Sequence, residues 1–167
     1  MLWIALALAL LQIIAGSAEL RGRAFVPVRP LAVAQGALTI GAFGLLIWLF
    51  ARSDMSVELV ARNSHSAKPM LYKISGAWGN HEGSMLLWLS ILGVAGAGVA
   101  LFERRLNART LAATLVAQAG LALGFFAFLL FVSNPFTRLV PAAAEGQGLN
   151  PLLQDPGLAF HPPPLDF

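Results

Sequence analysis

Four long apolar runs, divided by three polar joints, constrain this chain more than any other feature. They cover, roughly, residues 1–17, 31–51, 83–102 and 111–132. A helix of about 20 apolar residues crosses the hydrocarbon core of a bilayer, and in a helix every backbone polar group is satisfied internally. We therefore expect an all-α, polytopic helical membrane protein with about four transmembrane helices.

The composition agrees with a membrane protein and excludes several other classes. Hydrophobic residues make up 57% of the chain and charged residues only 11%, too few to cover the surface of a soluble domain. The 167 residues suffice for one membrane domain, 1–167. Without cysteine the chain cannot build a disulfide, a thiolate nucleophile or a cysteine-ligated metal site. The net charge of +3 favours the lipid bilayer over nucleic acid as a partner.

The first run has two interpretations, an uncleaved helix or a signal peptide. A signal peptide carries its positive charge before its apolar region. Here Arg21 and Arg23 follow the apolar region, which favours an uncleaved first helix.

The joints predict an orientation, because Lys and Arg in short loops stay on the cytoplasmic side. Arginines crowd the first and third joints: Arg21, Arg23, Arg29, Arg104, Arg105 and Arg109. The loop 52–82 spreads four basic residues over a longer stretch, and the tail 133–167 holds only Arg138. Both termini and the 52–82 loop are therefore expected on the outer, periplasmic side, together with all three histidines.

The outer loop contains two short segments with different patterns. Residues 57–61 alternate briefly between apolar and polar and favour a short extended piece, whereas 63–69 have turn chemistry. Residues 68–74 predict a short amphipathic helix lying in the membrane interface, with Pro69 at its start. His65 fits a solvated loop residue.

Trp78, His81 and Glu82 stand where the third apolar run begins. A zinc-protease helix is excluded because the residue four after His81 is Met85, so the second His is missing. Two interpretations stay open for His81 and Glu82: they satisfy backbone groups at the helix start, where a carboxylate suits the helix dipole, or they form a site.

The Pro-rich outer tail, 133–167, predicts a fixed extended path that ends at His161-Pro162-Pro163-Pro164. A neutral imidazole binds haem iron, and an apolar neighbour such as Phe160 shields a porphyrin. His161 is therefore a candidate axial ligand; the alternative is a histidine at the start of a further helix.

Five sequence blocks, in order along the chain, resemble the N-terminal part of the cytochrome c-type biogenesis protein CcmF family. The blocks are residues 63–66, 69–76, 78–88, 133–136 and 149–163. That family is the haem lyase component of the System I cytochrome c maturation machinery, in the inner membrane of bacteria and of plant mitochondria. The similarity covers the chain from the first helix onward.

The resemblance implies a function in haem handling. CcmF-like proteins receive a transient b-type haem from the haem chaperone CcmE and help attach it to apocytochrome c, with CcmH handling thiols. It implies that His161, in the family's His-Pro-Pro block, is a haem iron ligand. It places Trp78 and His81 in a signature block that shapes the outer haem pocket or the contact with the chaperone.

The sequence also departs from the family's pattern. Asp166 stands where the family has Tyr after His-Pro-Pro-x-Leu. The tryptophan-rich haem-binding domain, the second outer His and the membrane-embedded His ligands belong to later regions of the family. We therefore expect a truncated, frameshifted or split subunit, inactive without the remaining part of the CcmF-like protein. A non-catalytic membrane scaffold and a transporter subunit are the alternative functions.

Overall fold

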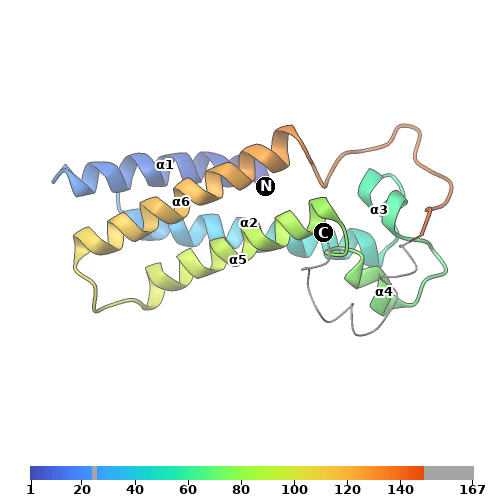
Figure 1. The fold of residues 1–167 in the computed structure, drawn as a ribbon, viewed down its shortest axis with the longest axis horizontal. Coiled ribbons are helices and arrows are strands. Elements are labelled where there is room, and N and C mark those ends of the chain that lie inside the picture. The colour runs from blue at the N-terminus through green and yellow to red at the C-terminus, as the bar shows by residue number, and fades with distance from the viewer. Residues whose placement is uncertain (24–25, 149–167) are drawn as a thin grey trace. The chain divides into compact units, whose positions relative to one another are not determined.

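The computed structural model describes residues 1–23 and 26–148. Within these ranges the chain is helical, as expected, with a single isolated bridge between Val57 and Arg138. The helices, shown in Figure 1, are α1 (Leu2–Leu20), α2 (Val28–Ala51), α3 (Glu58–Asn63), α4 (Met70–Ser75), α5 (His81–Phe102) and α6 (Ala108–Phe131).

Four of these helices, α1, α2, α5 and α6, are long and apolar enough to cross a membrane. Their bounds lie within about three residues of the predicted runs. Three of them, α2, α5 and α6, begin earlier than the apolar runs because polar residues such as Arg29 and His81 are compatible with a first turn at the membrane boundary. The all-α membrane fold is therefore confirmed for the described residues.

Contacts group the chain into two compact units, and α2 and α5 each contribute to both. The bundle unit comprises Met1–Ala42 and Trp88–Val132. The loop unit comprises Phe43–Leu87 and the tail that starts at Ser133. A single domain over 1–167 stays a prediction.

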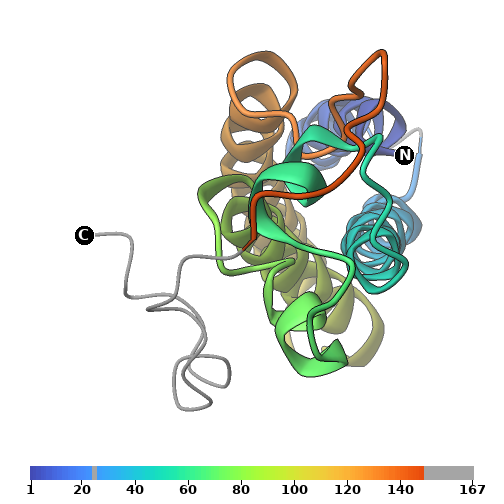
Figure 2. The ribbon, with the colours of Figure 1, turned by 90° about the vertical axis from the view of Figure 1, so that its right-hand side faces the viewer.

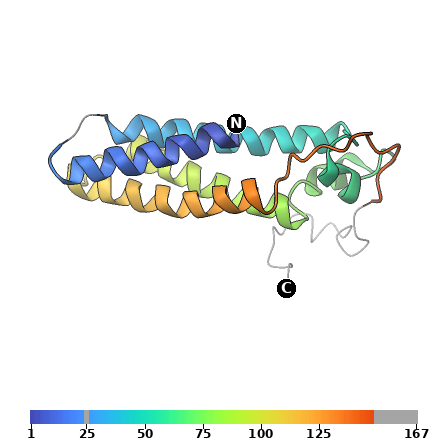
Figure 3. The same cartoon turned by 90° about the horizontal axis from the view of Figure 1, so that it is seen from above.

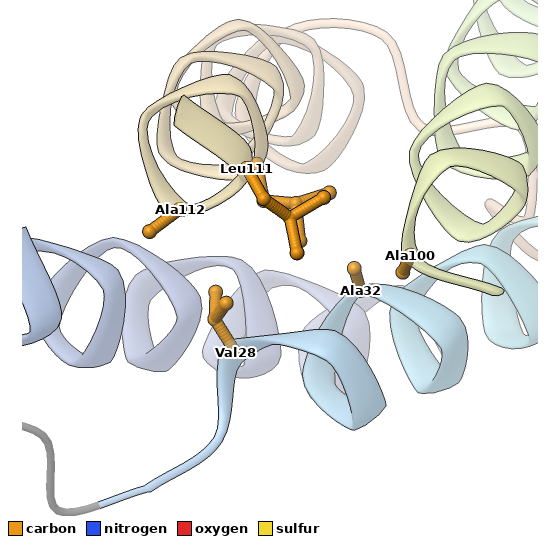
Figure 4. Close-up of a cluster of buried hydrophobic side chains, with 6 residues drawn as sticks. Val28, Ala32, Ala100, Leu111 and Ala112 are labelled. Atoms are coloured by element: carbon orange, nitrogen blue, oxygen red, sulfur yellow. The ribbon is translucent and has the colours of Figure 1, made fainter. Parts of the chain in front are cut away.

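In the bundle unit, α1 runs alongside α6 (Figure 3). One end is closed by small and branched apolar side chains from α2, α5 and α6, gathered in Figure 4: Val28, Ala32, Ala100, Leu111, Ala112 and Leu115. The helices α2 and α5 touch through their backbones, since a Cβ on Gly36 would lie 2.6 Å from the carbonyl oxygen of Gly93. Small residues permit this close approach in membrane bundles.

Three buried glutamines connect helices inside the bundle unit. The amide nitrogen of Gln12 donates to Oε1 of Gln118 (3.0 Å) and to the carbonyl oxygen of Leu115 (2.7 Å). The amide nitrogen of Gln118 donates in turn to Oε1 of Gln35 (3.2 Å). This chain joins α1, α6 and α2 and pairs the amide nitrogens of Gln12 and Gln118 inside an apolar interior, whereas Oε1 of Gln12 and Nε2 of Gln35 have no hydrogen-bond partner among the described residues.

In the loop unit, the tail pairs with the segment around α3 (Figure 2). The amide of Glu58 donates to the carbonyl oxygen of Thr137 (2.9 Å), and the amide of Leu139 donates to that of Ser56 (2.8 Å). Further along, the amide of Gln147 donates to the carbonyl oxygen of Ala61 (2.8 Å). Residues 133–148 are irregular, with a turn and several bends, and these hydrogen bonds attach them to the loop.

The helix α4 confirms the short helix predicted over 68–74, with Pro69 as its N-cap residue. The prediction of an extended piece over 57–61 is wrong for most of that segment, because α3 occupies Glu58–Asn63. An ion pair between Glu58 and Arg62, four residues apart, supports this helix. Within the segment 57–61, only Val57 takes part in a β-bridge, which it forms with Arg138 of the tail.

Candidate functional site at the start of α5 and in the loop unit

Asn80 organises the turn that leads into α5. Its side chain is 8% exposed, and its Oδ1 accepts a hydrogen bond from the backbone N–H of Gly83 (2.7 Å). Its amide nitrogen donates back to the carbonyl oxygen of Gly76 (2.6 Å). Asparagine is among the best N-cap residues because its oxygen satisfies an N–H that has no partner in the helix. Asn80 therefore fixes both sides of this turn.

Glycine is required inside the turn for steric reasons. A Cβ on Gly83 would lie 1.9 Å from the carbonyl oxygen of Ala77, which no side chain can tolerate. A Cβ on Gly76 would lie 3.0 Å from Cε1 of Phe50, the fully buried ring beside it. The Trp-Gly-Asn-His-Glu-Gly sequence thus forms a tightly closed local structure.

Trp78 lies in this turn and is half-buried. Its indole Nε1 is buried and has no hydrogen-bond partner among the described residues. Leaving such a donor unpaired costs about 1–3 kcal/mol. The indole N–H is therefore a donor suited to an acceptor from outside these residues.

His81 and Glu82 are the first two residues of α5. His81 is exposed and Glu82 is half-buried. Asn80 supplies a capping hydrogen bond at this helix start, and Glu82 lies in the first turn, where a carboxylate suits the helix dipole. The two interpretations of His81 and Glu82 both stay predictions. An Asn directly before an apolar periodic run is a helix-start signal, and it identifies Asn80 from sequence.

His65 is half-buried, and its Nδ1 accepts a hydrogen bond from the backbone N–H of Ala67 (3.2 Å). A neutral imidazole whose Nδ1 accepts carries its proton on Nε2. That arrangement leaves no free lone pair on the neutral ring, so His65 is arranged as a local structural residue.

A carboxylate clamp, not predicted from sequence, holds the tail beside His65. Glu145 accepts hydrogen bonds from the backbone N–H of Ser66 (3.0 Å), from the Ser66 hydroxyl, and from the backbone N–H of Gly146 (2.9 Å). The Ser66 hydroxyl is the main reason that the pKa of Glu145 falls to about 2, followed by the two backbone donors and, last, by the positive charge of a protonated His65. Burial opposes the shift.

A second carboxylate, Asp54, joins the other end of the tail. Its Oδ1 accepts from the backbone N–H of Ser56 (3.1 Å) and from the Ser56 hydroxyl, and Arg138 lies 3.4 Å from its Oδ2. The Ser56 hydroxyl is the main cause of the lowered pKa of Asp54, against the raising effect of burial; the Ser56 backbone N–H and Arg138 lower it further. The tail is thus attached to the loop at two carboxylates.

The described residues do not by themselves fit a haem. His81 is exposed and His65 is half-buried with Nδ1 engaged, so the two imidazoles supply no enclosed pair of axial ligands. Over 1–23 and 26–148, no group of three or more His, Cys, Asp or Glu side chains could hold a metal ion. The unpartnered Trp78 N–H is the feature that would suit a polar ligand. His161, the predicted iron ligand, lies outside the described residues.

The fold and the loop unit define a multi-pass helical membrane protein, and comparisons with known proteins specify it further. Residues 78–165 match the family model described as cytochrome C assembly protein. A match over more than half of the chain shows the family: the chain belongs to the cytochrome c assembly proteins. The resemblance to CcmF-type proteins that the sequence motifs indicated is confirmed.

Curated relatives agree with this assignment. The chain is 54% identical over 134 residues to the cytochrome c-type biogenesis protein ccl1 of Rhodobacter capsulatus, covering 80% of this chain and 20% of that protein. It is 50% identical over 165 residues to CycK of Bradyrhizobium diazoefficiens, covering 97% and 25%. For CcmF of Escherichia coli the identity is 44% over 126 residues, covering 75% and 20%.

A solved structure shares the fold. The chain superposes on a cytochrome c haem lyase CcmF with a TM-score of 0.71, at 24% identity, covering 81% of this chain and 23% of that one. The chain therefore spans about a fifth to a quarter of the length of the relatives it matches.

Proposed function

We propose that the chain serves in cytochrome c maturation as the N-terminal membrane part of a CcmF-like haem lyase. In this role it takes part in haem transfer from a haem chaperone to apocytochrome c. The observation that supports this most is the match of residues 78–165 to the cytochrome c assembly family, together with 50% identity to CycK over nearly the whole chain. The partners proposed are the remaining part of the CcmF-like protein, CcmE, apocytochrome c and CcmH.

The proposal includes His161 as a ligand of the haem iron, with Trp78 and His81 belonging to the same haem-handling surface. Covalent attachment joins a vinyl group of the haem to a thiol of the apocytochrome. The reactivity belongs to the haem, and the protein holds the haem in position and excludes water. Trp78 suits this surface because its buried N–H lacks a partner among the described residues. Asn80 and Gly83 would act as positioning residues that fix the turn carrying Trp78 and His81.

We further propose that both termini and the loop 52–82 face the periplasm, in the inner membrane of a bacterium or a mitochondrion. The two joints in the bundle unit, between α1 and α2 and between α5 and α6, carry four arginines, and two more, Arg29 and Arg109, lie in the first turns of α2 and α6. The positive-inside rule places such joints in the cytoplasm. The loop and the tail then share the outer compartment, where they would meet apocytochrome c.

Deletion of the chain from its own cell tests the function. We expect covalent haem on c-type cytochromes to disappear, measured by haem staining of denatured membrane and periplasmic fractions, and to return when the chain is supplied again. The matched control is a membrane protein that carries noncovalent haem, whose haem content should not change. Normal covalent haem in the deleted cells would contradict the proposal.

A non-catalytic scaffold is the second candidate, favoured by the backbone contact between Gly36 and Gly93. Under that alternative, substitution of His161 would leave maturation unchanged, whereas substitution of Gly36 would prevent assembly. A transporter subunit would instead show flux without haem when it is reconstituted in vesicles.

A further inference from the structure

A cavity of about 610 Å³ opens at one end of the bundle unit. Its lining includes Glu19, Val26, Arg29, Leu106, Ala108 and Leu111. These residues come from the α1–α2 joint, the α5–α6 joint and the adjoining helix ends. Since α1 ends at Leu20 and α6 begins at Ala108, the cavity lies at a boundary of the membrane-spanning region.

The inner wall of the cavity is apolar. Val28 and Leu111 line it and belong to the buried cluster of Figure 4, where they are 2% and 4% exposed. Leu106, at the mouth, is 41% exposed. A ligand here would therefore meet hydrocarbon on one side.

Arg29 provides a fixed positive charge in the same cavity. Its Nη1 donates to the carbonyl oxygen of Ala100 (2.8 Å), and its Nη2 donates to the carbonyl oxygen of Glu103 (3.1 Å). These bonds hold the guanidinium at the end of α5 and use two of its five N–H donors. The remaining donors can serve an anion, and a guanidinium matches phosphate geometry well.

The surroundings are strongly basic. The segments 19–29 and 103–109 contain six arginines and two carboxylates, Glu19 and Glu103, which leaves a net charge of +4. Oε1 of Glu103 accepts from the backbone N–H groups of Arg105 (2.6 Å) and Leu106 (3.2 Å). The ion pairs found in the described part of the chain involve none of these six arginines.

We propose that this cavity binds an anionic phospholipid of the bilayer that the bundle spans. The lipid phosphate would lie against Arg29, and the upper part of an acyl chain against Leu106 and Leu111. Basic pockets between transmembrane helices bind anionic headgroups, because the charge attracts the phosphate while the helices accept the chain. Glu19, the one carboxylate in the lining, favours a headgroup with hydroxyl donors, such as phosphatidylglycerol, over one with several phosphates.

Native mass spectrometry of the 167-residue chain in detergent tests the proposal, with phosphatidylglycerol, phosphatidylethanolamine and phosphatidylcholine added separately. We expect phosphatidylglycerol to bind roughly tenfold more tightly than phosphatidylcholine. Arg29→Gln should remove most of this preference. Arg29 also bonds the end of α5, so its substitution can disturb the helix as well as the site. A second variant, Ala108→Phe, therefore fills the cavity without changing any charge.

The matched control is Ala113→Phe, which adds the same ring to an exposed position of α6 outside the cavity lining and should keep the preference. Three results would overturn the proposal. The first is equal binding of all three lipids. The second is a phosphatidylglycerol preference that survives Ala108→Phe. The third is displacement of the lipid by excess inorganic phosphate, which would assign the site to a free anion.

Discussion

The bundle unit and the loop unit are stabilised in different ways. The bundle depends on side-chain fit: a Cβ on Gly93 would lie 2.4 Å from the Thr39 hydroxyl oxygen, and three glutamines are hydrogen-bonded inside it. The loop unit depends on backbone pairing between the tail and the region of α3, and on exposed carboxylates such as Glu145. Packing changes should therefore damage the bundle, whereas pH should act on the loop unit.

The largest expected effect comes from adding one carbon where α2 and α5 touch. Gly36→Ala would place Cβ 2.6 Å from the Gly93 carbonyl oxygen, so the helices must separate. We expect a loss of about 2–3 kcal/mol in the free energy of unfolding, as overpacking of a tight core typically causes. Denaturation in detergent, followed by circular dichroism, measures it.

The control for this change is Gly98→Ala on α5, where nothing lies within 4 Å of the new Cβ. Its stability should stay at or slightly above that of the unchanged chain. An equal loss in both variants would show that close helix approach is not what stabilises the bundle.

The glutamine chain should give the next effect. Gln118→Leu removes hydrogen bonds to Gln12 and Gln35 and leaves their buried amides with fewer partners. The expected loss is about 1–2 kcal/mol, in line with unpaired buried polar groups and with hydrogen bonds between membrane helices. The same denaturation measurement applies.

The double variant Gln12→Leu with Gln118→Leu separates two contributions to the free energy of unfolding: the hydrogen bond between the two side chains, and the cost of leaving one of them buried without its partner. Because both partners are then apolar, its loss should be smaller than the sum of the two single losses. Strict additivity would mean that the glutamines do not interact.

A smaller effect is expected from the cap of α5 in the loop unit. Asn80→Ala removes the acceptor for the Gly83 N–H and should cost about 1 kcal/mol. Hydrogen exchange at Gly83 and Ser84 measures it locally. Asn80→Asp keeps the acceptor, so its exchange should stay close to that of the unchanged chain; equal exchange in the Ala and Asp variants would exclude capping.

The smallest effect is confined to the tail and depends on pH. The pKa of Glu145 is lowered from 4.5 to about 2 in the folded chain, so its contribution is complete above pH 4.5 and disappears as the pH falls toward 2. Proteolysis of the tail by an acid-active protease should therefore accelerate across that range, while the circular dichroism of the bundle stays constant.

Glu145→Gln is the control for this dependence. It lacks the charged acceptor, so the tail should already be cleaved faster at neutral pH and the step between pH 4.5 and 2 should flatten. An unchanged pH profile in this variant would assign the effect to another group, such as Asp54, the loop carboxylate that pairs with Arg138 of the tail.

The sequence was sufficient for the four long helices, because each apolar run satisfies its own backbone and needs no distant partner. It did not predict the glutamine chain, since Gln12 and Gln118 are 106 residues apart and no local pattern links them. The hydrogen bonds between Ser66 and Glu145 were not predicted for the same reason, since these residues are 79 positions apart. Helix α3 was missed because six residues are too short for a helical period to be distinguished from a strand.

The candidate site divides in the same way. The motif around Trp78 marked the turn that leads into α5, where a helix-start signal identifies Asn80 as the cap. The unpartnered indole N–H of Trp78 depends on how the turn packs, which residue spacing cannot show. The sequence thus located the turn, and the structure identified which residues shape it.

The haem spectrum of the assembled lyase with His161→Ala tests the central claim most directly. Because an imidazole ligand determines the iron's absorption bands, we expect the outer haem signal and the yield of covalent cytochrome c to fall together. His65→Ala is the matched control and should leave both unchanged, since its Nδ1 serves the local backbone. An unaltered spectrum and yield in the His161 variant would contradict the haem-handling account.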